Sequence, residues 1–397
     1  MQISRIGFTG LGTSGHAHRL VYSASMPYEI TSGHPVLPEN TAEPTPRNAI
    51  NDRERYSRQV LFAPIGDNGQ QRLARGHAAI VGIGATGTAT ASLLARAGVG
   101  RLTLIDRDYV EPSNLQRQVL FDENDARECL PKAEAARLHL ARVNSGINVT
   151  ALIADLIPRN AGTLISDADI VLDCTDNFET RYLINDLCVR DGRPWIYAAA
   201  VGAYAATMNI LPRPANHEAT SAEPTACLAC LFPASPAGNV ETCDTAGILS
   251  SAVNFAASLQ VTETLKLLTG QADRMRRTLL AYDLWTGERS EVTAGVPRAD
   301  CEVCGHRQFR ALAGEGRAPI TLCGRNAVQI HEHARPVDLA ALARRLEPLG
   351  EVRVNGLLLR FRTPAHTITV FPDGRALIQG TTDVARARSL YARYIGA

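Results

Sequence analysis

Short apolar runs alternate with amphipathic stretches between about Asn51 and Phe309. Strands that alternate with helices are typical of a parallel sheet with helices on both faces. We therefore expect an α/β fold built on a Rossmann-like, doubly wound, mostly parallel sheet. The apolar runs expected to form its strands are Ala78–Val81, Leu102–Ile105, Val149–Ile153, Ile170–Cys174, Trp195–Ala199 and Ala206–Ile210.

The pattern is lost at the start of the chain. Residues 1–50 contain five prolines and no sustained apolar period, which predicts a disordered extension. The segment Gly10–Gly15 has the glycine spacing of a nucleotide-binding loop. It lacks both a strong strand before it and a strand ending in an acid after it, and the motif needs that setting. We assign it no function.

A second unit is expected near the end of the chain. Glycines, a proline and charges over residues 311–319 predict a linker. It separates a first domain, residues 51–310, from a small α+β domain, residues 320–397, whose chemistry the sequence does not reveal. The strands expected in the small domain are Val352–Val354, Leu357–Phe361, Thr367–Phe371 and Ala376–Ile378, and its helices are Val337–Arg345 and Asp383–Tyr394.

Composition narrows the class of protein. The 397 residues are 45% hydrophobic and 20% charged, with a net charge of +1, as in a soluble globular protein. This balance gives no reason to expect nucleic-acid or anionic-membrane binding. No apolar stretch approaches the roughly 18 residues of a membrane helix, and no secretory signal is visible. Nine cysteines, four of them in two Cys-x-x-Cys pairs, favour a reducing compartment, so we expect a cytoplasmic location.

A glycine-rich loop follows the first expected strand. Gly82, Gly84 and Gly87 lie between that strand and a helix expected over Thr88–Ala97, and Asp106 ends the next strand, 19 residues past Gly87. In this setting the helix N-terminus binds phosphate oxygens and the acid bonds a ribose hydroxyl. The loop alone equally fits a dehydrogenase or a tight strand–helix turn.

Polar residues after the loop favour chemistry on the phosphates. Arg117, in Ser113–Gln118, and Lys132, at a helix start after Pro131, could stabilise charge at an attacked phosphorus. Asp176 follows an expected strand and could hold Mg²⁺ through its carboxylate oxygens. Surface solvation is the ordinary alternative for Arg117 and Lys132. For Asp173 we prefer a structural role in a cap or turn.

The cysteine pairs predict a metal site. Four thiolates suit a closed, tetrahedral, structural Zn²⁺ site, here clamping two distant segments. Cys243 stands apart, in a Pro/Gly-rich stretch before the long helix expected from about Gly247. A reactive nucleophile and a passive loop thiol are equally open readings for it. The four expected ligands are Cys227, Cys230, Cys301 and Cys304.

Taken together, the segment from Arg55 to about His306 closely resembles the ThiF/MoeB/HesA family, the ubiquitin-activating-type adenylyltransferases of molybdopterin and thiamine biosynthesis. The stretches that carry the resemblance run in the family's order over about two thirds of the chain. They are Arg55–Gln59, Gly82–Gly87, Ala97–Gly100, Ser113–Gln118, Pro131–Lys132, Asp173–Asn177, Cys227–Cys230 and Cys301–Gly305.

The resemblance implies an ATP-dependent enzyme. The C-terminal glycine carboxylate of a ubiquitin-like sulfur carrier ending in Gly-Gly would attack the α-phosphate of Mg·ATP, and sulfur transfer to the resulting acyl-adenylate would follow. Asp106 would bind ribose and Asp176 magnesium, and the four paired cysteines would bind zinc. Arg58 would reach into the ATP site of a second subunit, which implies a homodimer. The residues implied to contact the nucleotide also include Asn114, Gln116, Arg117, Lys132 and Asn177.

Three departures from the family pattern stand out. Ala85-Thr86 replaces a glycine and an apolar residue in the loop, and Phe121–Leu130 is about two residues longer than usual. The last domain lacks the cysteine loop of the rhodanese domain fused to some relatives, so a separate sulfur-donor enzyme is a further candidate partner. In some members the cysteine matching Cys243 forms a covalent link or passes on sulfur, whereas others do not need it.

Two alternative functions are kept beside the adenylyltransferase. A non-catalytic scaffold of the same fold would bind the carrier without activating it. An NAD-dependent oxidoreductase would explain the glycine loop but not Arg58, Arg117, Lys132 or the zinc clamp. The identity of the carrier, and hence the pathway, is not readable from the sequence.

Overall fold

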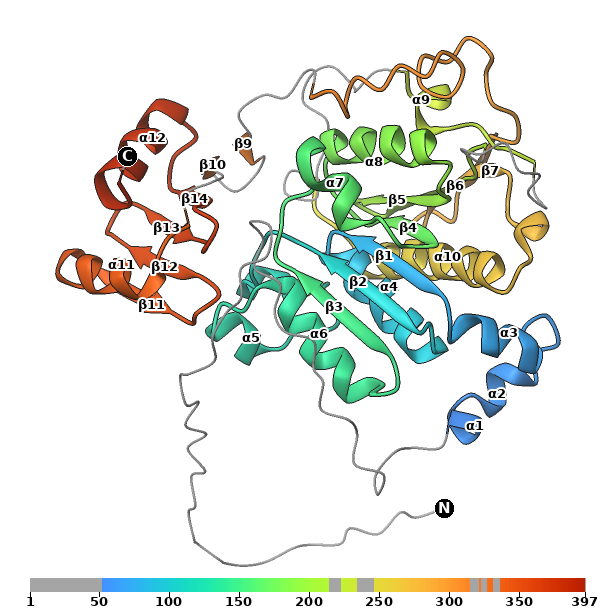
Figure 1. Ribbon diagram of the computed structural model, residues 1–397, viewed down its shortest axis with the longest axis horizontal. Helices are drawn as coiled ribbons and strands as arrows, with labels where there is room; N and C mark the ends of the chain where they lie inside the picture. The colour runs from blue at the N-terminus through green and yellow to red at the C-terminus, as the bar shows by residue number, and fades with distance from the viewer. Residues whose placement is uncertain are drawn as a thin grey trace, which may run out of the picture.

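The computed structural model describes residues 52–213, 223–233, 246–314, 321–322, 327–330 and 336–396. The predicted disordered extension, residues 1–50, and Cys243 lie outside them. Two β-sheets organise the described residues (Figure 1).

The larger sheet has eight strands in the order β3-β2-β1-β4-β5-β6-β7-β8. The first five are mutually parallel, and β6, β7 and β8 are antiparallel. The mostly parallel sheet is confirmed, and each of its expected strands lies within a residue or two of the observed one. The strands are β1 (His77–Val81), β2 (Arg101–Ile105), β3 (Asn148–Leu152), β4 (Ile170–Asp173), β5 (Trp195–Val201), β6 (Tyr204–Ile210), β7 (Thr278–Asp283) and β8 (Arg289–Thr293).

The antiparallel edge formed by β7 and β8 was not predicted. Every residue of β8 is exposed, so the strand has no buried face and shows no alternation of apolar and polar residues. Its position is set by backbone pairing with β7, from Thr278–Thr293 to Tyr282–Arg289. Pairing of this kind leaves no periodic signal in a short polar segment.

Helices cover both faces of the large sheet (Figure 1). Along β1, Ala79 and Val81 face the core shared with α7 and α8, whereas Ala78 and Ile80 face the core shared with α4, α6 and α10. This alternation on a parallel strand buried on both sides is the doubly wound arrangement. These helices are α4 (Ala85–Ala97), α6 (Lys132–Val143), α7 (Pro158–Leu164), α8 (Phe178–Asp191) and α10 (Ser250–Leu268).

Shorter helices lie at the periphery of the sheet. Cys227 and Cys230 sit at α9. None of the helices in the described ranges is long and apolar enough to cross a bilayer. The shorter helices are α1 (Asp52–Arg55), α2 (Ser57–Val60), α3 (Gly66–Leu73), α5 (Glu123–Arg127) and α9 (Leu228–Leu231).

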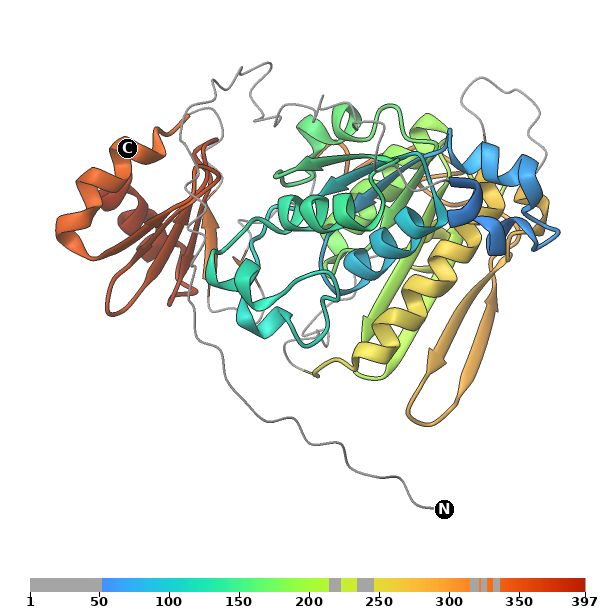
Figure 2. The same cartoon turned by 90° about the horizontal axis from the view of Figure 1, so that it is seen from below.

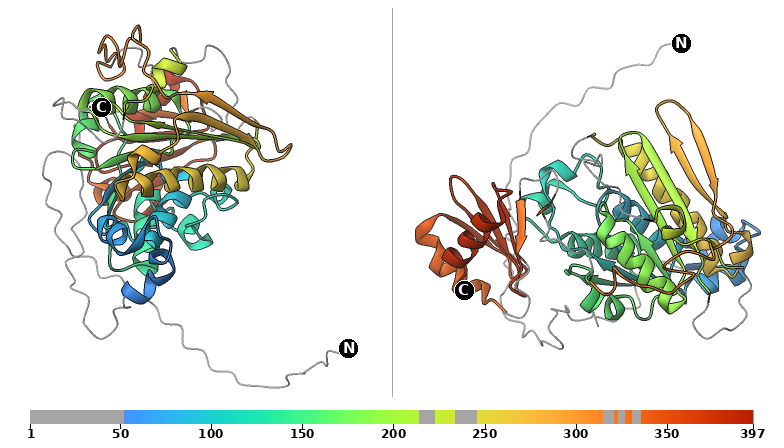
Figure 3. Two further views of the ribbon diagram at one scale, coloured as in Figure 1. Left: turned by 90° about the vertical axis from the view of Figure 1, so that its right-hand side faces the viewer. Right: turned by 90° about the horizontal axis from the view of Figure 1, so that it is seen from above.

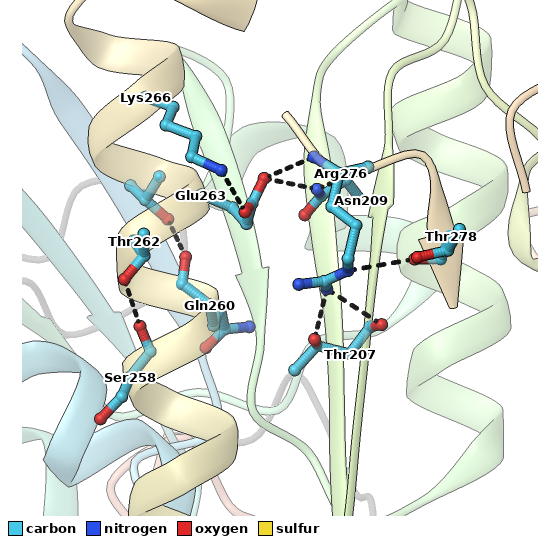
Figure 4. A network of polar contacts seen from close by, with 10 residues as sticks. Thr207, Asn209, Ser258, Gln260, Thr262, Glu263, Lys266, Arg276 and Thr278 are labelled. Carbon is cyan, nitrogen blue, oxygen red and sulfur yellow. Dashed lines mark hydrogen bonds and ion pairs between the residues drawn. The ribbon is translucent and has the colours of Figure 1, made fainter. Parts of the chain in front are cut away.

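Buried polar residues fix α10 against the sheet. The Gln260 amide donates to the carbonyls of Asp173 and Ile196, at 3.0 Å each, so it joins the end of β4 to the start of β5. One turn further, Glu263 accepts from Lys266 at 2.7 Å and from Asn209 at 2.8 Å (Figure 4). Because buried polar groups are costly unless paired, these bonds define one register of the helix on the sheet.

The smaller sheet is antiparallel, with six strands in the order β11-β12-β13-β14-β10-β9. One face is covered by α11 (Leu339–Leu346) and α12 (Val384–Tyr394) around a core that includes Phe361 and Ile368. We call this unit the C-terminal sheet. Its four predicted strands and two predicted helices are present, and β9 and β10 were not predicted. The strands are β9 (Thr321–Leu322), β10 (Ala327–Ile330), β11 (Glu351–Val354), β12 (Leu359–Arg362), β13 (Thr367–Val370) and β14 (Ala376–Gln379).

Candidate functional site

The glycine loop lies at the point where the strand order reverses, between β1 and β4. Gly82 has a φ of +89°, and a Cβ there would lie 2.8 Å from the carbonyl oxygen of Cys174. A Cβ on Gly87 would collide with the Gly82 carbonyl. Both glycines are therefore needed for the tight turn against the end of β4.

Gly84 differs from the other two glycines. It precedes the first residue of α4, and a Cβ there would meet nothing closer than the Gln118 side chain at 4.0 Å. The space in front of this 13-residue helix is thus open to a ligand. Exposed N–H groups and the helix dipole make that position suitable for an anion.

Asp106, at the end of β2, braces this loop. One carboxylate oxygen accepts from the Ile83 N–H at 2.6 Å, and the other accepts from the Asp108 N–H at 2.7 Å. Burial raises the pKa of Asp106, and the charge of Lys132 opposes that rise. Each oxygen keeps a lone pair for a further donor such as a hydroxyl. The bracing role could not be read from the sequence.

Residues 109–131, which include α5, form a long connection between β2 and α6, here called the 109–131 loop, beside the glycine loop. Asn114 is buried, and its side-chain oxygen accepts from the Glu111 N–H at 3.0 Å. Arg117 is half-buried and donates to the Ser113 carbonyl at 2.9 Å. Gln116 is exposed and donates to the Ile248 carbonyl at 3.3 Å.

Gln118 is a site residue to which the sequence analysis gave no role. It is 3% exposed, and its side-chain oxygen has no hydrogen-bond partner among the residues that the structure describes. Its amide nitrogen is the atom nearest to the open side of Gly84. A buried polar atom without a protein partner beside a nucleotide loop is suited to bind a ligand. Its place in the motif Ser113–Gln118 was the only signal for it.

Lys132 is the first residue of α6 and is 3% exposed. Its ammonium lies 3.2 Å from a carboxylate oxygen of Asp108. A lysine is rarely buried without a charge to balance it. The interpretation of Lys132 as an ordinary solvated surface residue is therefore wrong.

The carboxyl end of β4 carries two acids with different surroundings. Asp173 is fully buried, and it accepts from the N–H and the hydroxyl of Thr175, at 2.9 and 2.6 Å. The guanidinium of Arg181 lies 3.3 Å from its other oxygen. Burial raises the pKa of Asp173. These contacts confirm the preferred structural role of Asp173 in a turn.

Asp176, in contrast, is exposed at the same edge of the sheet. The side chain of Asn177 caps α8 by accepting from the Thr180 N–H at 2.9 Å. Burial favours the neutral form of nearby Arg107, yet surrounding carboxylates raise its pKa. Asp176 is one of these acids, together with Asp155, Asp108 and Asp106. This edge of the sheet therefore concentrates negative charge beside the glycine loop.

The four paired cysteines meet in space. Their Sγ atoms lie within 4.8 Å of one another, with separations of 3.9 Å for Cys227 and Cys230, 3.7 Å for Cys227 and Cys301, and 3.4 Å for Cys230 and Cys304. Metal–sulfur bonds of about 2.3 Å in a tetrahedron require sulfur atoms about 3.8 Å apart. The donor set therefore fits a tetrahedral metal ion.

Polar groups surround this cluster. The Arg298 N–H points at the Cys230 sulfur at 3.4 Å, and the Asn185 amide approaches the Cys227 sulfur at 3.9 Å. Asn185 also accepts from the Leu228 N–H at 2.9 Å, which ties α9 to α8. Donors of this kind orient thiolate ligands.

Arg58 lies far from the glycine loop of its own chain. It is exposed on α2, and its neighbour Gln59 donates to the carbonyl of Ala97 at 2.8 Å. Ala97 is the last residue of α4, whereas the glycine loop precedes the first. Thirteen residues of helix span about 20 Å, so α2, which carries Arg58, and the glycine loop lie at opposite ends of α4 (Figure 1).

Comparisons with known proteins agree with this geometry. The chain is 47% identical over 346 residues, which is 86% of this chain and 99% of the relative, to the sulfur carrier protein ThiS adenylyltransferase of Bacillus subtilis. It is 36% identical over 254 residues, 64% of this chain and 90% of the relative, to the sulfur carrier protein adenylyltransferase of Thermus thermophilus.

A solved structure shares the fold. The crystal structure of E. coli MccB with ATP superimposes with a TM-score of 0.53 at 25% identity, over 66% of this chain and 76% of that one. Residues 56–303 match the ThiF family. They include the glycine loop, the 109–131 loop, Asp176 and three of the four clustered cysteines. The chain therefore belongs to the ThiF family.

Proposed function

We propose that this protein uses ATP to adenylylate the C-terminal glycine carboxylate of a ubiquitin-like sulfur-carrier protein. The observation that carries the proposal is the burial of Lys132 beside a loop built to receive phosphates. A nicotinamide enzyme binds its pyrophosphate with the loop and helix dipole alone. A fixed cation at this position instead suits a reaction in which charge builds on a phosphate.

The residues predicted to contact the nucleotide have the following places in the proposed reaction. Loop N–H groups and Lys132 bind the phosphates, and Asp106 accepts from the ribose. Asn114 and Arg117 stabilise charge on the α-phosphate, with Gln116 and Asn177 at the rim of the site. A carboxylate oxygen of the carrier bonds to the α-phosphorus, the bond from that phosphorus to the bridging oxygen breaks, and pyrophosphate leaves with the electron pair.

Asp176 is the proposed holder of Mg²⁺. It is an exposed acid at the carboxyl edge of the sheet, where it can reach phosphates that enter from solvent. A bound Mg²⁺ would neutralise charge on the phosphates. Neighbouring Asp173 is committed to its turn and to Arg181, so it is not a metal ligand in this proposal.

A homodimer follows from the position of Arg58. Because α4 separates Arg58 from its own glycine loop, an Arg58 that acts on ATP must act on the ATP of a second copy. We propose that two chains pair so that each contributes Arg58 to the other's site.

The cysteine cluster is proposed to hold a structural Zn²⁺. All four donors are thiols, so the site leaves no open position for chemistry. We propose a cytoplasmic location, because four cysteines gathered as a metal site suit a reducing compartment. A separate sulfur-donor enzyme and the role of Cys243 stay predictions.

The two sheets support the proposed division into residues 51–310 and 320–397, joined by 311–319.

ATP–pyrophosphate exchange tests the proposal. Purified protein is assayed with a thiamine-type carrier, a molybdopterin-type carrier, and the same carriers lacking the terminal glycine. The relative with 47% identity acts on ThiS by name, so we expect exchange with the thiamine-type carrier. Asp176→Ala is expected to abolish exchange and leave the fold intact. Failure of every intact carrier to support exchange, with folded dimer, would favour the non-catalytic scaffold.

A further inference from the structure

The 109–131 loop closes on itself at a narrow neck. Tyr109 and Pro131 form an isolated antiparallel bridge. On either side of it, the Val110 N–H bonds the Leu130 carbonyl and the Lys132 N–H bonds the Asp108 carbonyl, both at 2.8 Å. We call these paired segments, 108–111 and 128–132, the neck. Its geometry sets where the loop holds Asn114 and Arg117, and it positions Lys132 directly.

The C-terminal sheet contacts both strands of the neck. Gln379 of β14 accepts from the Tyr109 hydroxyl at 3.3 Å and donates to the Glu111 carboxylate at 3.2 Å. Arg360 of β12 donates to the Cys129 sulfur at 3.2 Å, and its guanidinium lies 5.5 Å from the centre of the Tyr109 ring. Arg360 therefore bridges the two strands.

The apolar pattern of the C-terminal sheet explains this docking. On β12, Phe361 faces the core with α11 and α12, while the adjoining Leu358 faces the other way. Leu358, Phe371 and Leu377 form a separate buried cluster with Tyr109 and other residues of the large-sheet unit. The central strands of the sheet are thus buried on both faces, whereas the edge strand β11 is largely exposed. The face opposite α11 and α12 is turned toward the large-sheet unit (Figures 2 and 3).

The C-terminal sheet also contacts the chain just after the end of β3. Arg375 is 2% exposed, and it donates to the Ile153 carbonyl at 2.9 Å. Two residues further, Asp155 pairs with Arg107 at 3.1 Å. Arg107 follows Asp106, which braces the glycine loop. The C-terminal sheet therefore contacts the neck directly, and it contacts the chain two residues before the Asp155–Arg107 pair that lies beside Asp106.

One residue of the neck is held in a costly conformation. Cys129 has a φ of +50°, a region that non-glycine residues rarely adopt. Such strain persists only where the surrounding structure fixes it, and it gathers at functional sites. The Cys129 sulfur and the Glu128 carbonyl both accept from the C-terminal sheet, from Arg360 and Asn355.

We propose that the C-terminal sheet is a positioning element for adenylation. By clamping the neck, Arg360 and Gln379 hold the 109–131 loop in the geometry that aims Asn114, Arg117 and Lys132 at the phosphates. This inference rests on the proposed function of the site. It gives the docked face of the sheet an intramolecular role.

Arg360→Ala tests the clamp, with two matched variants. Arg360→Lys keeps a cation near the Tyr109 ring. Arg353→Ala removes an exposed arginine directly opposite on β11, whose partner is Glu351. The alanine variant at Arg360 is expected to lower kcat for pyrophosphate exchange roughly tenfold or more, because small displacements of catalytic groups are costly. The lysine variant should recover much of this loss, and Arg353→Ala should match wild type.

Amide hydrogen exchange at Val110 and Lys132 gives a readout independent of catalysis. In Arg360→Ala these two amides should exchange faster, while amides of β1 and β4 keep their protection. Gln379→Ala repeats the test if Arg360→Ala fails to fold. A wild-type kcat in Arg360→Ala, together with unchanged amide hydrogen exchange in the neck, would overturn the clamp. A kcat loss that tracks only the folded fraction would overturn it as well. If wild type showed no pyrophosphate exchange, the proposed function would be refuted. The amide hydrogen exchange measurement would still decide whether the clamp exists.

Discussion

Replacing Arg181 by methionine is expected to leave a buried carboxylate without its counter-ion. Arg181 is 6% exposed and lies 3.3 Å from an oxygen of Asp173, which is 0% exposed. Its guanidinium also donates to the Thr175 carbonyl at 2.6 Å and stacks on the ring of Tyr197. Methionine keeps an unbranched apolar stem but removes every one of these polar contacts.

The size of the loss follows from the fate of Asp173. Breaking a buried pair by removing one partner costs about 3–5 kcal/mol. Asp173 can escape by taking up a proton, which from its ordinary pKa of 3.8 costs about 4 kcal/mol at pH 7. We therefore expect the free energy of unfolding to fall by about 3–4 kcal/mol at pH 7. The folded-state pKa of Asp173, which burial already raises, would rise further.

The sign of the pH dependence follows. A carboxyl whose folded-state pKa is raised favours the folded state below its unfolded pKa and loses that contribution as pH rises. The deficit of Arg181→Met should thus be smaller near pH 4, where only the loss of the Thr175 and Tyr197 contacts remains, and largest at pH 7 to 8. Urea unfolding of wild type, both single variants and Asp173→Asn/Arg181→Met at pH 4.5 and pH 7.5 measures it.

The double variant is the decisive comparison. Asparagine keeps an acceptor for Thr175 without the charge, so the double variant should be more stable than Arg181→Met at pH 7.5. Equal stability of these two variants, or a deficit that does not change with pH, would refute the reasoning. Folded Asp173→Asn should also retain pyrophosphate exchange, since Asp173 has a structural role.

Three further predictions concern buried polar groups and the cysteine cluster. Burial raises the pKa of Asp186 to about 6. Asp186→Asn should therefore raise the free energy of unfolding by about 1–3 kcal/mol at pH 8 and change it little near pH 4. Equal shifts of the urea midpoint at both pH values would contradict this. Gln260→Leu should cost about 3–5 kcal/mol in urea unfolding, because two strand carbonyls lose their donor, whereas Thr262→Ala, exposed on the same helix, should stay within about 0.5 kcal/mol. Cys301→Ser should lose the single zinc per chain expected by metal analysis and lower Tm; full zinc retention would exclude Cys301 as a ligand.

The site could be predicted where it depends on local pattern. Gly82 and Gly87 are needed within one turn, so their spacing and the flanking strand were sufficient to predict the nucleotide-binding loop. Gln118 and the burial of Lys132 were different, because both depend on how the 109–131 loop folds back over the glycine loop. From the sequence, Lys132 could be either a surface residue or a site residue, and only its 3% exposure decides between them.

The cysteine cluster shows the same division. Pair spacing predicted four ligands, but 70 residues separate Cys230 from Cys301, and no local rule brings such segments together. Their approach is fixed by α9 packing on α8 through Asn185 and by the core around Cys227 and Cys301.

The sequence by itself determined the α/β class, the nucleotide loop and the residue types of the site. Each of these depends on residues that are only a few positions apart in the sequence, where backbone geometry acts directly. The tertiary structure decided which side chains are buried, that Arg58 is remote from its own loop, and that the C-terminal sheet grips the neck. Those outcomes depend on which surfaces, formed by segments far apart in the sequence, are complementary in shape and polarity. The hydrophobic periodicity of a single segment contains no information about that.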